Sequence, residues 1–262
     1  MKKSLVVLVG MMVASSLVFG EKKEFTIMTY NVRHCAGMDL KLNIEKTASV
    51  IKEQNPRFVA LQEMDSKTKR SNNVDQAAKL GELTGLEPTF GATIDFNGGK
   101  YGVAILSKEK PIKVEQIALP PRTGETRTAL IAEFEDVYFI STHWVHNKGN
   151  SALRMESAKI IAEKAKELKD KPIIICGDLN SLPPSQEIKE FKKTFAVLSP
   201  ENCRSYHGSE AVGPSGTVDD FCIDYIAIDN KNVEKFKVLS SYVVNDDKTS
   251  DHKPLVVKVE KK

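Results

Sequence analysis

Acidic, amide and histidine side chains stand at the ends of apolar, strand-like runs throughout this chain. They are Asn31, Glu63, His143, Asp178, Asn180, Asp224, Asp251 and His252. The ends of adjacent strands in a layered α/β domain lie within a few side-chain lengths of one another, and ligands usually bind there. Each residue alone could be a turn former or a helix cap. Six such junctions, supplying carboxylates, carboxamides and two histidines, predict instead a polar, metal-capable site suited to hydrolysis.

The segments between these residues alternate between strand-like and helix-like patterns of apolar residues. We expect strands at Phe25–Thr29, Phe58–Leu61, Tyr101–Leu106, Ala129–Phe134, Val137–Thr142, Pro172–Cys176, Cys222–Ile228, Phe236–Val243 and Leu255–Val259. We expect helices at Leu42–Gln54, Asp75–Thr84, Ser151–Leu168 and Glu187–Phe191. Roughly nine or ten strands exceed one comfortable sheet, and no repeat or linker divides the chain. The pattern therefore predicts one α/β domain in which two sheets pack face to face with helices outside.

The start of the chain has the pattern of a secretory signal peptide. Met1–Lys3 is basic, Ser4–Phe19 is apolar, and Val18 and Gly20 stand at the positions that precede a cut. The apolar run is shorter than the ~20 residues that a membrane span needs. We therefore expect a signal peptide at residues 1–20, a mature domain at residues 21–262 without a transmembrane span, and a periplasmic or secreted protein.

Charge does not point to nucleic acid as a partner. The chain has 38 Lys and Arg against 35 Asp and Glu, a net charge of +3. A duplex-binding protein usually carries a concentrated basic face, and the sequence contains no such concentration. DNA stays open as a substrate, but the charge balance does not favour it.

Four cysteines in an exported chain allow three pairings. Cys203 and Cys222 flank an irregular segment that a disulfide could close. Cys176 lies in an apolar run and is most simply a buried thiol, whereas Cys35 cannot be assigned. No two cysteines have the short spacing of zinc ligands, so the sequence disfavours a zinc site.

Six segments of the chain resemble the motifs of the endonuclease/exonuclease/phosphatase superfamily and occur in the same order. They are Thr29–Val32, Leu61–Glu63, Ser141–His143, Gly177–Ser181, Ile223–Ile226 and Ser250–Pro254. The superfamily includes deoxyribonuclease I, abasic-site endonucleases, inositol polyphosphate phosphatases and bacterial neutral sphingomyelinases, and this chain resembles a secreted bacterial member. The motifs span essentially the whole mature chain. The resemblance implies a four-layer α/β/β/α sandwich of two packed mixed sheets flanked by helices, in agreement with the two-sheet pattern.

The resemblance also implies a metal site. Glu63 matches the main metal ligand of the family, Asn31 lies beside it, and Asp251 matches a residue near the metal. A carboxylate, an amide and water molecules suit Mg²⁺, with Mn²⁺ as a second possibility. Such an ion polarises a phosphoryl oxygen and neutralises developing charge.

The catalytic groups follow from the same motifs. His252 matches the catalytic histidine and Asp224 its carboxylate partner, which fixes the imidazole tautomer and stabilises the protonated ring. Asp178 and Asn180 match the pair that orients the attacking water and holds the phosphate, and His143 matches a second phosphate-facing histidine. The sequence leaves open whether His252 or Asp178 takes the proton of the water.

Three further residues are candidates for substrate binding. Arg70 and Arg127 could clamp phosphate, because arginine binds phosphate through two N–H groups. His207 lies in a segment that resembles a short motif of secreted bacterial members, which indicates that it faces the cleft. His146 is expected to be an ordinary loop histidine, and Trp144 a packing residue.

These observations predict an exported, monomeric, Mg²⁺-dependent hydrolase that attacks a small or lipid-derived phosphoester with water, in line at phosphorus. One alternative is a secreted nuclease similar to deoxyribonuclease I. An alternative of another class is a binding protein that kept the fold and lost catalysis. That last alternative predicts damage in at least one catalytic position, and no catalytic position is missing.

Overall fold

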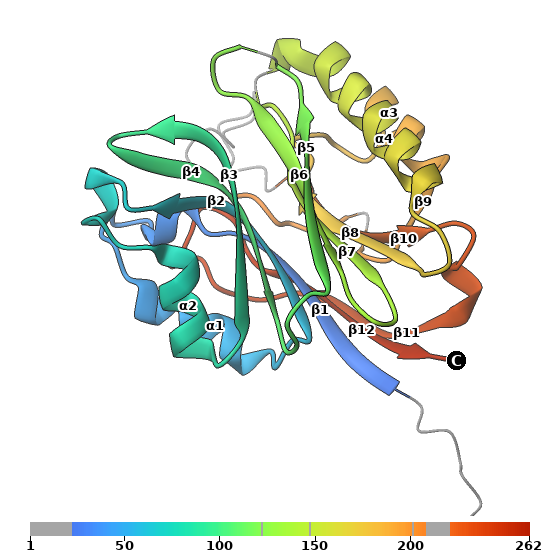
Figure 1. Ribbon diagram of the computed structural model, residues 1–262, viewed down its shortest axis with the longest axis horizontal. Coiled ribbons are helices and arrows are strands. Elements are labelled where there is room, and N and C mark those ends of the chain that lie inside the picture. Colours follow the sequence, from blue (N-terminus) through green and yellow to red (C-terminus); the bar gives the residue numbers. More distant parts are fainter. Residues whose placement is uncertain (1–22, 122, 147, 201, 208–220) are drawn as a thin grey trace, which may run out of the picture.

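The computed structural model describes residues 23–121, 123–146, 148–200, 202–207 and 221–262, which form two six-stranded sheets flanked by helices (Figure 1). The predicted signal peptide at residues 1–20 lies outside the described residues. In spatial order the first sheet contains β11 (Phe236–Val243), β12 (Leu255–Lys261), β1 (Lys23–Asn31), β2 (Phe58–Ser66), β4 (Gly99–Ser107) and β3 (Glu87–Phe96). The second contains β5 (Lys113–Leu119), β6 (Arg127–Glu133), β7 (Tyr138–His143), β8 (Ile173–Asp178), β10 (Asp224–Asp229) and β9 (Phe195–Val197).

The helices cover the outer faces of the two sheets. Helices α1 (Ile44–Glu53) and α2 (Gln76–Thr84) lie on the first sheet, and α3 (Ser151–Glu167) and α4 (Gln186–Lys192) on the second (Figure 1). Short 3-10 turns complete the described elements: η1 (Arg33–Cys35), η2 (Lys69–Ser71), η3 (Lys148–Asn150) and η4 (Val233–Lys235). Both sheets are mixed, because β1 runs parallel to β2 and β7 parallel to β8. The predicted four-layer sandwich is confirmed.

The alternating direction of side chains along the central strands explains why the fold has layers on both faces of each sheet. On β1, Phe25 and Ile27 enter the core between the two sheets, whereas Met28 and Tyr30 enter the core beneath α1 and α2. Successive strand residues point to opposite faces of a sheet. A strand that is apolar on both faces is therefore buried on both, and it requires a layer on each side.

Each predicted strand and helix is found in its expected segment, and three strands were missed. β3 and β5 are edge strands that keep many residues exposed, so they lack the apolar signal of a buried strand. β9 has only three residues. The helix α2 begins where the Asp75 carboxylate accepts from the Ala78 N–H, and it ends at Gly85, whose φ of 74° suits only glycine well.

The cysteines divide into one disulfide and two buried thiols. Cys203 and Cys222 are bonded across 19 residues, as the sequence allowed, and Cys35 and Cys176 are free and buried. Among the helices of the described ranges, none combines the length and the apolar character that crossing a membrane requires.

Arg57 joins the two sheets at the end that lies away from the polar strand ends. It donates to Glu109 and, through Nη2 at 2.7 Å and Nη1 at 3.1 Å, to Asp136 in the β6–β7 turn. Its guanidinium lies over the ring of Phe58, 4.6 Å from the centroid. Burial opposes ionisation of Asp136, but the Arg57 guanidinium outweighs it and lowers the pKa of Asp136 to about 2.

Asp136→Asn is therefore expected to destabilise the protein by about 1–2 kcal/mol at neutral pH. The pKa of Asp136 is depressed in the folded state, so its contribution is present above the pKa of the unfolded chain and is lost as the pH falls toward about 2. Denaturant titrations at pH 7 and near pH 3 measure this difference. The control is Glu135→Gln, an exposed carboxylate in the same turn. An equal loss of stability in both variants would contradict the role of Asp136.

Candidate active site

Strand register brings the polar residues together at one end of the sandwich. In the second sheet, Asp178 pairs with His143 on one side and with Asp224 on the other, so three predicted residues stand side by side. In the first sheet, Asn31 ends β1 and pairs with Gln62 of β2. His252 lies in the segment before β12, which pairs with β1 and so reaches the same end. Register alone thus assembles residues that are more than 200 positions apart in the sequence.

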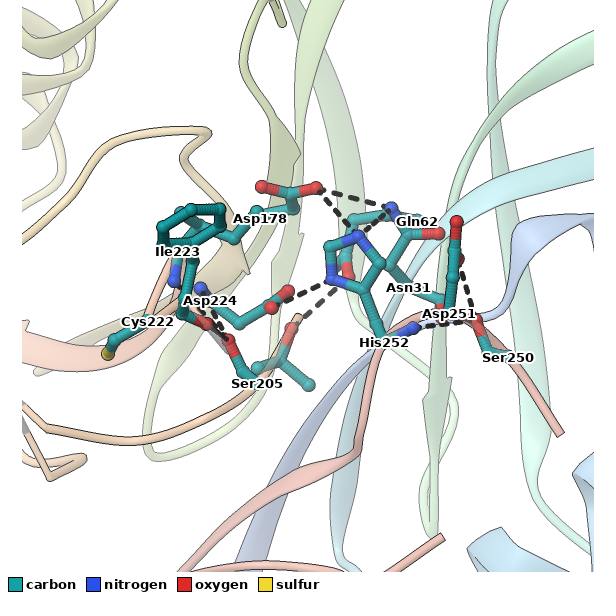
Figure 2. Close-up of polar contacts among 12 residues, drawn as sticks. Asn31, Gln62, Asp178, Ser205, Cys222, Ile223, Asp224, Ser250, Asp251 and His252 are labelled. Atoms are coloured by element: carbon teal, nitrogen blue, oxygen red, sulfur yellow. Dashed lines mark hydrogen bonds and ion pairs between the residues drawn. The ribbon is translucent and has the colours of Figure 1, made fainter. Parts of the chain in front are cut away.

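A chain of hydrogen bonds connects the two sheets through Asn31 (Figure 2). The Asn31 amide donates to Glu63 Oε1 at 3.0 Å and to Asp178 Oδ2 at 3.2 Å. His252 Nδ1 donates to Asp224 Oδ2 at 2.9 Å. The other ring nitrogen, His252 Nε2, is 3.6 Å from Asp178 Oδ2 and 3.5 Å from the Asn31 amide nitrogen. The predicted pairing of Asp224 with His252 is present in the structure.

Burial and neighbouring charges give the two histidines opposite character. Burial lowers the pKa of His252, but the carboxylates of Asp224, Asp178 and Asp251 outweigh it and raise that pKa to about 10. For His143, burial and the Arg127 guanidinium act in the same direction and hold the pKa well below its usual value. One imidazole is therefore a cation at neutral pH and the other is neutral.

Asp178 is buried between these histidines. Burial, followed by the charge of Asp224, raises the pKa of Asp178 to about 7, although His252 opposes the shift. A carboxyl group with a pKa near neutrality can both accept and release a proton under ordinary conditions.

The chain matches the family described as "Endonuclease/Exonuclease/phosphatase family" over residues 28–252. It belongs to this family. Members of the family hydrolyse phosphoesters. The recognition made from six ordered motifs is confirmed.

Solved structures of the family share the fold at low sequence identity. An endonuclease/exonuclease/phosphatase from Bacteroides vulgatus is 18% identical, with a TM-score of 0.72 over 92% of this chain and 100% of that one. A mannosyl-6-phosphatase from Bacteroides thetaiotaomicron is 20% identical, with a TM-score of 0.64 over 90% of this chain and 99% of that one. Recombination repair protein 1 of Drosophila melanogaster is 28% identical over 160 residues, or 58% of this chain. The chain spans only 22% of the length of that curated relative.

In this family member, Glu63 reaches the site through a β-bulge. Leu61 pairs with Ala104 and Met64 with Gly102, so Gln62 and Glu63 together oppose a single residue of β4. Glu63 has a φ of 58°, in the left-handed region that costs about 1–3 kcal/mol for a residue of this kind. Bulges redirect side chains next to active sites. Beyond this bulge, β2 resumes its pairing with β4 at Met64 and continues to Ser66, past the predicted end at Leu61.

A cleft of about 970 Å³ opens above these residues. Six of the eight predicted catalytic and metal-binding residues line it: Glu63, His143, Asp178, Asn180, Asp251 and His252. Asn31 and Asp224 are fully buried and lie behind the lining, where they hold Glu63, Asp178 and His252 by hydrogen bonds. The backbone N–H of Asn180 donates to Asp178 Oδ1 at 2.9 Å, and its amide donates to the Trp144 carbonyl at 3.0 Å.

The two predicted arginines line the cleft, and each is already bonded to a carboxylate. Arg70 donates to the buried Asp65 through Nε at 2.7 Å and Nη2 at 2.9 Å, and it lies over Phe96, 4.5 Å from the ring centroid. Arg127 is bonded to Glu125 through Nη1, but its buried Nε has no partner among the described residues. Both arginines thus bring a paired guanidinium to the cleft wall.

The third substrate-binding candidate, His207, does not line the cleft. Its backbone N–H donates to the Asp251 carbonyl at 2.9 Å, so this residue supports the segment that carries His252. The neighbouring Tyr206 lines the cleft instead, and its ring centroid is 4.8 Å from that of His252. The segment was recognised, but the tyrosine rather than the histidine lines the cleft.

Arg154 and His146 are polar residues of the cleft that were not predicted to lie there. Arg154 is buried and donates to Glu187 Oε1 at 3.0 Å, and no motif distinguished it from other helix arginines. His146 is an exposed loop residue, as expected, but it also lines the cleft. Its position three residues after His143 was the available signal. Trp144 is fully buried and packs against Phe191, as expected for a packing residue.

The charge distribution around Glu63 suits a cation. Burial raises the pKa of Glu63, the hydrogen bond from Asn31 opposes that shift, and the negative charge of Asp251 adds to it. Among the described residues, only Asn31 donates a hydrogen bond to the Glu63 carboxylate. Hard oxygen ligands of this kind suit Mg²⁺ or Mn²⁺. Asp178, Asp224 and His252 also place ligand atoms within 4.8 Å of one another, but Asp224 and His252 already bond each other.

Proposed function

We propose that this family member is an exported phosphoester hydrolase that depends on a divalent cation and acts on a small or lipid-derived ester. The observation that carries the proposal is the hydrogen-bonded chain from Glu63 through Asn31 to Asp178, next to the Asp224–His252 pair. This chain places a cation-binding carboxylate, a group that can accept a proton and a positively charged imidazole at one point. These are the groups that water needs to attack phosphorus.

Glu63 would hold the divalent cation, with Asn31 and Asp251 beside it. When bound, it neutralises negative charge on the phosphoryl oxygens. Asp178 takes a proton from the attacking water, because its pKa of about 7 leaves it partly deprotonated at neutral pH. The water oxygen bonds to phosphorus as the ester oxygen leaves with its electron pair. His252 is held as a cation by Asp224 and stabilises the charge that develops on the phosphate.

Two further residues hold the phosphate. Asn180 is fixed by its bonds to Asp178 and to the Trp144 carbonyl, and it faces the cleft. His143 is neutral because its pKa is low, so one ring nitrogen donates and the other accepts. Its Nε2 is 3.5 Å from Asp178 Oδ2. This arrangement orients the ester without adding another positive charge.

Charge pairing in the cleft favours a small substrate over a nucleic acid. The three arginines that line it are bonded to Asp65, Glu125 and Glu187 of the same chain. Duplex affinity comes largely from cations that contact phosphates and release counterions. Arginines already neutralised by carboxylates supply little of that affinity. The nearly balanced charge of the whole chain supports the same conclusion.

Two observations support export. The first twenty residues have the pattern of a signal peptide, and Cys203 and Cys222 form a disulfide. Structural disulfides persist mainly in oxidising compartments such as the periplasm and the extracellular medium. A non-catalytic binding role is disfavoured, because every predicted catalytic residue is present and the hydrogen bonds among them are formed.

A hydrolysis panel with Mg²⁺ or Mn²⁺ tests the proposal. The substrates are plasmid DNA, sphingomyelin, a phosphoinositide and a chromogenic phosphoester, and His252→Ala controls for contaminating enzymes. We expect turnover of a small or lipid ester that changes little as salt rises, and slow or absent DNA cleavage. Efficient nicking of plasmid by the wild type but not by His252→Ala would favour the nuclease. Inactivity on all substrates would favour the binding protein.

A further inference from the structure

The loop that follows β7 is fixed at three successive carbonyl groups, those of Trp144, Val145 and His146. The donors are the side chains of Asn180, Arg154 and Asn150, at 3.0, 3.2 and 2.8 Å respectively. These donors come from the loop after β8, from α3 and from the turn before α3. His146 is thus held in position although its side chain is exposed.

Arg127 fixes the protonation of the His146 ring. Its Nη2 is 3.2 Å from His146 Nδ1. A guanidinium can only donate hydrogen bonds, so Nδ1 must accept and the ring proton must be on Nε2. The Nε2–H group of His146 is therefore the donor available to a molecule in the cleft. Nothing in the described part of the chain accepts from that nitrogen.

Arg127 itself has an unused donor. The residue is only 4% exposed, and its Nε has no partner among the described residues. Leaving a buried charged donor unpaired is costly. The side chain lines the cleft, so the guanidinium brings a positive charge to the cleft wall.

The two residues line the cleft on the side of His143. Thr128, which follows Arg127, pairs with His143 across β6 and β7, and His143 pairs with Asp178 across β7 and β8. Arg127 and His146 therefore belong to the wall of the cleft that lies beyond His143, away from the Asp224–His252 pair.

We propose that Arg127 and His146 bind a terminal phosphate oxygen that phosphodiesters lack, which makes this chain a phosphomonoesterase and His146 a specificity residue. The inference rests on the proposed function. A monoester carries a third terminal oxygen and close to two negative charges at neutral pH. A guanidinium and an N–H donor suit that oxygen. In a diester this position carries a carbon substituent, which would leave both donors unpaired, and sites built to hydrogen-bond a group strongly reject analogues without it.

The test compares two esters that share one leaving group, 4-nitrophenyl phosphate and methyl 4-nitrophenyl phosphate, with Mg²⁺ or Mn²⁺. We expect the wild type to prefer the monoester. His146→Ala should lower kcat/KM for the monoester roughly 10- to 100-fold and should leave any diester turnover within about threefold. Inhibition by inorganic phosphate should weaken in parallel. His146→Gln keeps an N–H donor and should recover part of the loss.

Lys166→Ala, on a lysine that is 66% exposed on α3, is the control for handling and should match the wild type. Because His146 is exposed, its variants are expected to fold. Equal losses on both esters, or a wild type that prefers the diester, would overturn the inference and leave the proposed function standing. A wild type that hydrolyses neither ester nor any substrate of the panel would overturn both.

Discussion

Replacing His252 with alanine is expected to lower kcat by roughly 10²–10⁴, the usual contribution of a positioned acid–base group. The imidazole is only 4% exposed, and its pKa is raised to about 10 by Asp224 and the other nearby carboxylates despite its burial. Alanine removes this cation from the phosphate. Steady-state kinetics on the best substrate of the panel measures the loss, and circular dichroism shows whether the fold is retained.

Asp224 provides the matching test, because it acts through His252. Asp224→Asn should also lower kcat, and the double variant His252→Ala/Asp224→Asn should lose little more than the more damaged single variant, since residues that act as a unit are not additive. His252→Ala leaves the Asp224 carboxylate buried without its partner, which destabilises the fold. The double variant removes that charge and should recover stability but not activity. Near-wild-type turnover by Asp224→Asn would refute the role of the pair.

The sequence left open which residue is the general base, and the choice requires the three-dimensional structure. Asp178 and His252 are both present in the motifs, but their protonation depends on burial and on the separations of Asp224, Asn31 and His143. The structure raises the pKa of Asp178 to about 7 and that of His252 to about 10. These values favour Asp178 as the acceptor of the proton. No property of the linear sequence reports such distances.

The fold could be predicted from the sequence because the central strands are apolar on both faces and because α1, α2 and α4 each begin at a side-chain cap. β3 and β5 could not be predicted, because an edge strand exposes one face and one unpaired edge to solvent. The sequence of such a strand therefore resembles that of a loop. The catalytic residues were accessible because each follows a strand end in a motif. Arg154 and His146 could not be predicted from the sequence. The position of Arg154 depends on its hydrogen bond to a loop carbonyl, and that of His146 on its hydrogen bond with Arg127.

Chelation is expected to abolish activity, and Mg²⁺ or Mn²⁺ is expected to restore it. The reason is that Glu63 is close enough to Asp251 to be repelled by it, and among the described residues no lysine or arginine forms an ion pair with Glu63. Glu63→Gln keeps the shape and removes the charge. It should weaken apparent metal affinity at least tenfold, which corresponds to about 1.4 kcal/mol. Metal titrations of activity measure this effect. Full activity in excess chelator, or restoration by Zn²⁺ alone, would refute the site.

Thermal unfolding distinguishes a lost ligand from a damaged fold. A cation that binds only the folded state raises Tm with its concentration, so the wild type should be stabilised by Mn²⁺ and Glu63→Gln much less. Without metal, Glu63→Gln should unfold no earlier than the wild type, because it removes one of two carboxylates that repel each other. Asp95→Asn is the matched control: this carboxylate is at the cleft rim, 81% exposed and paired with Lys100. A Mn²⁺ shift lost equally in both variants would mean that the cleft binds cations by diffuse charge rather than through Glu63.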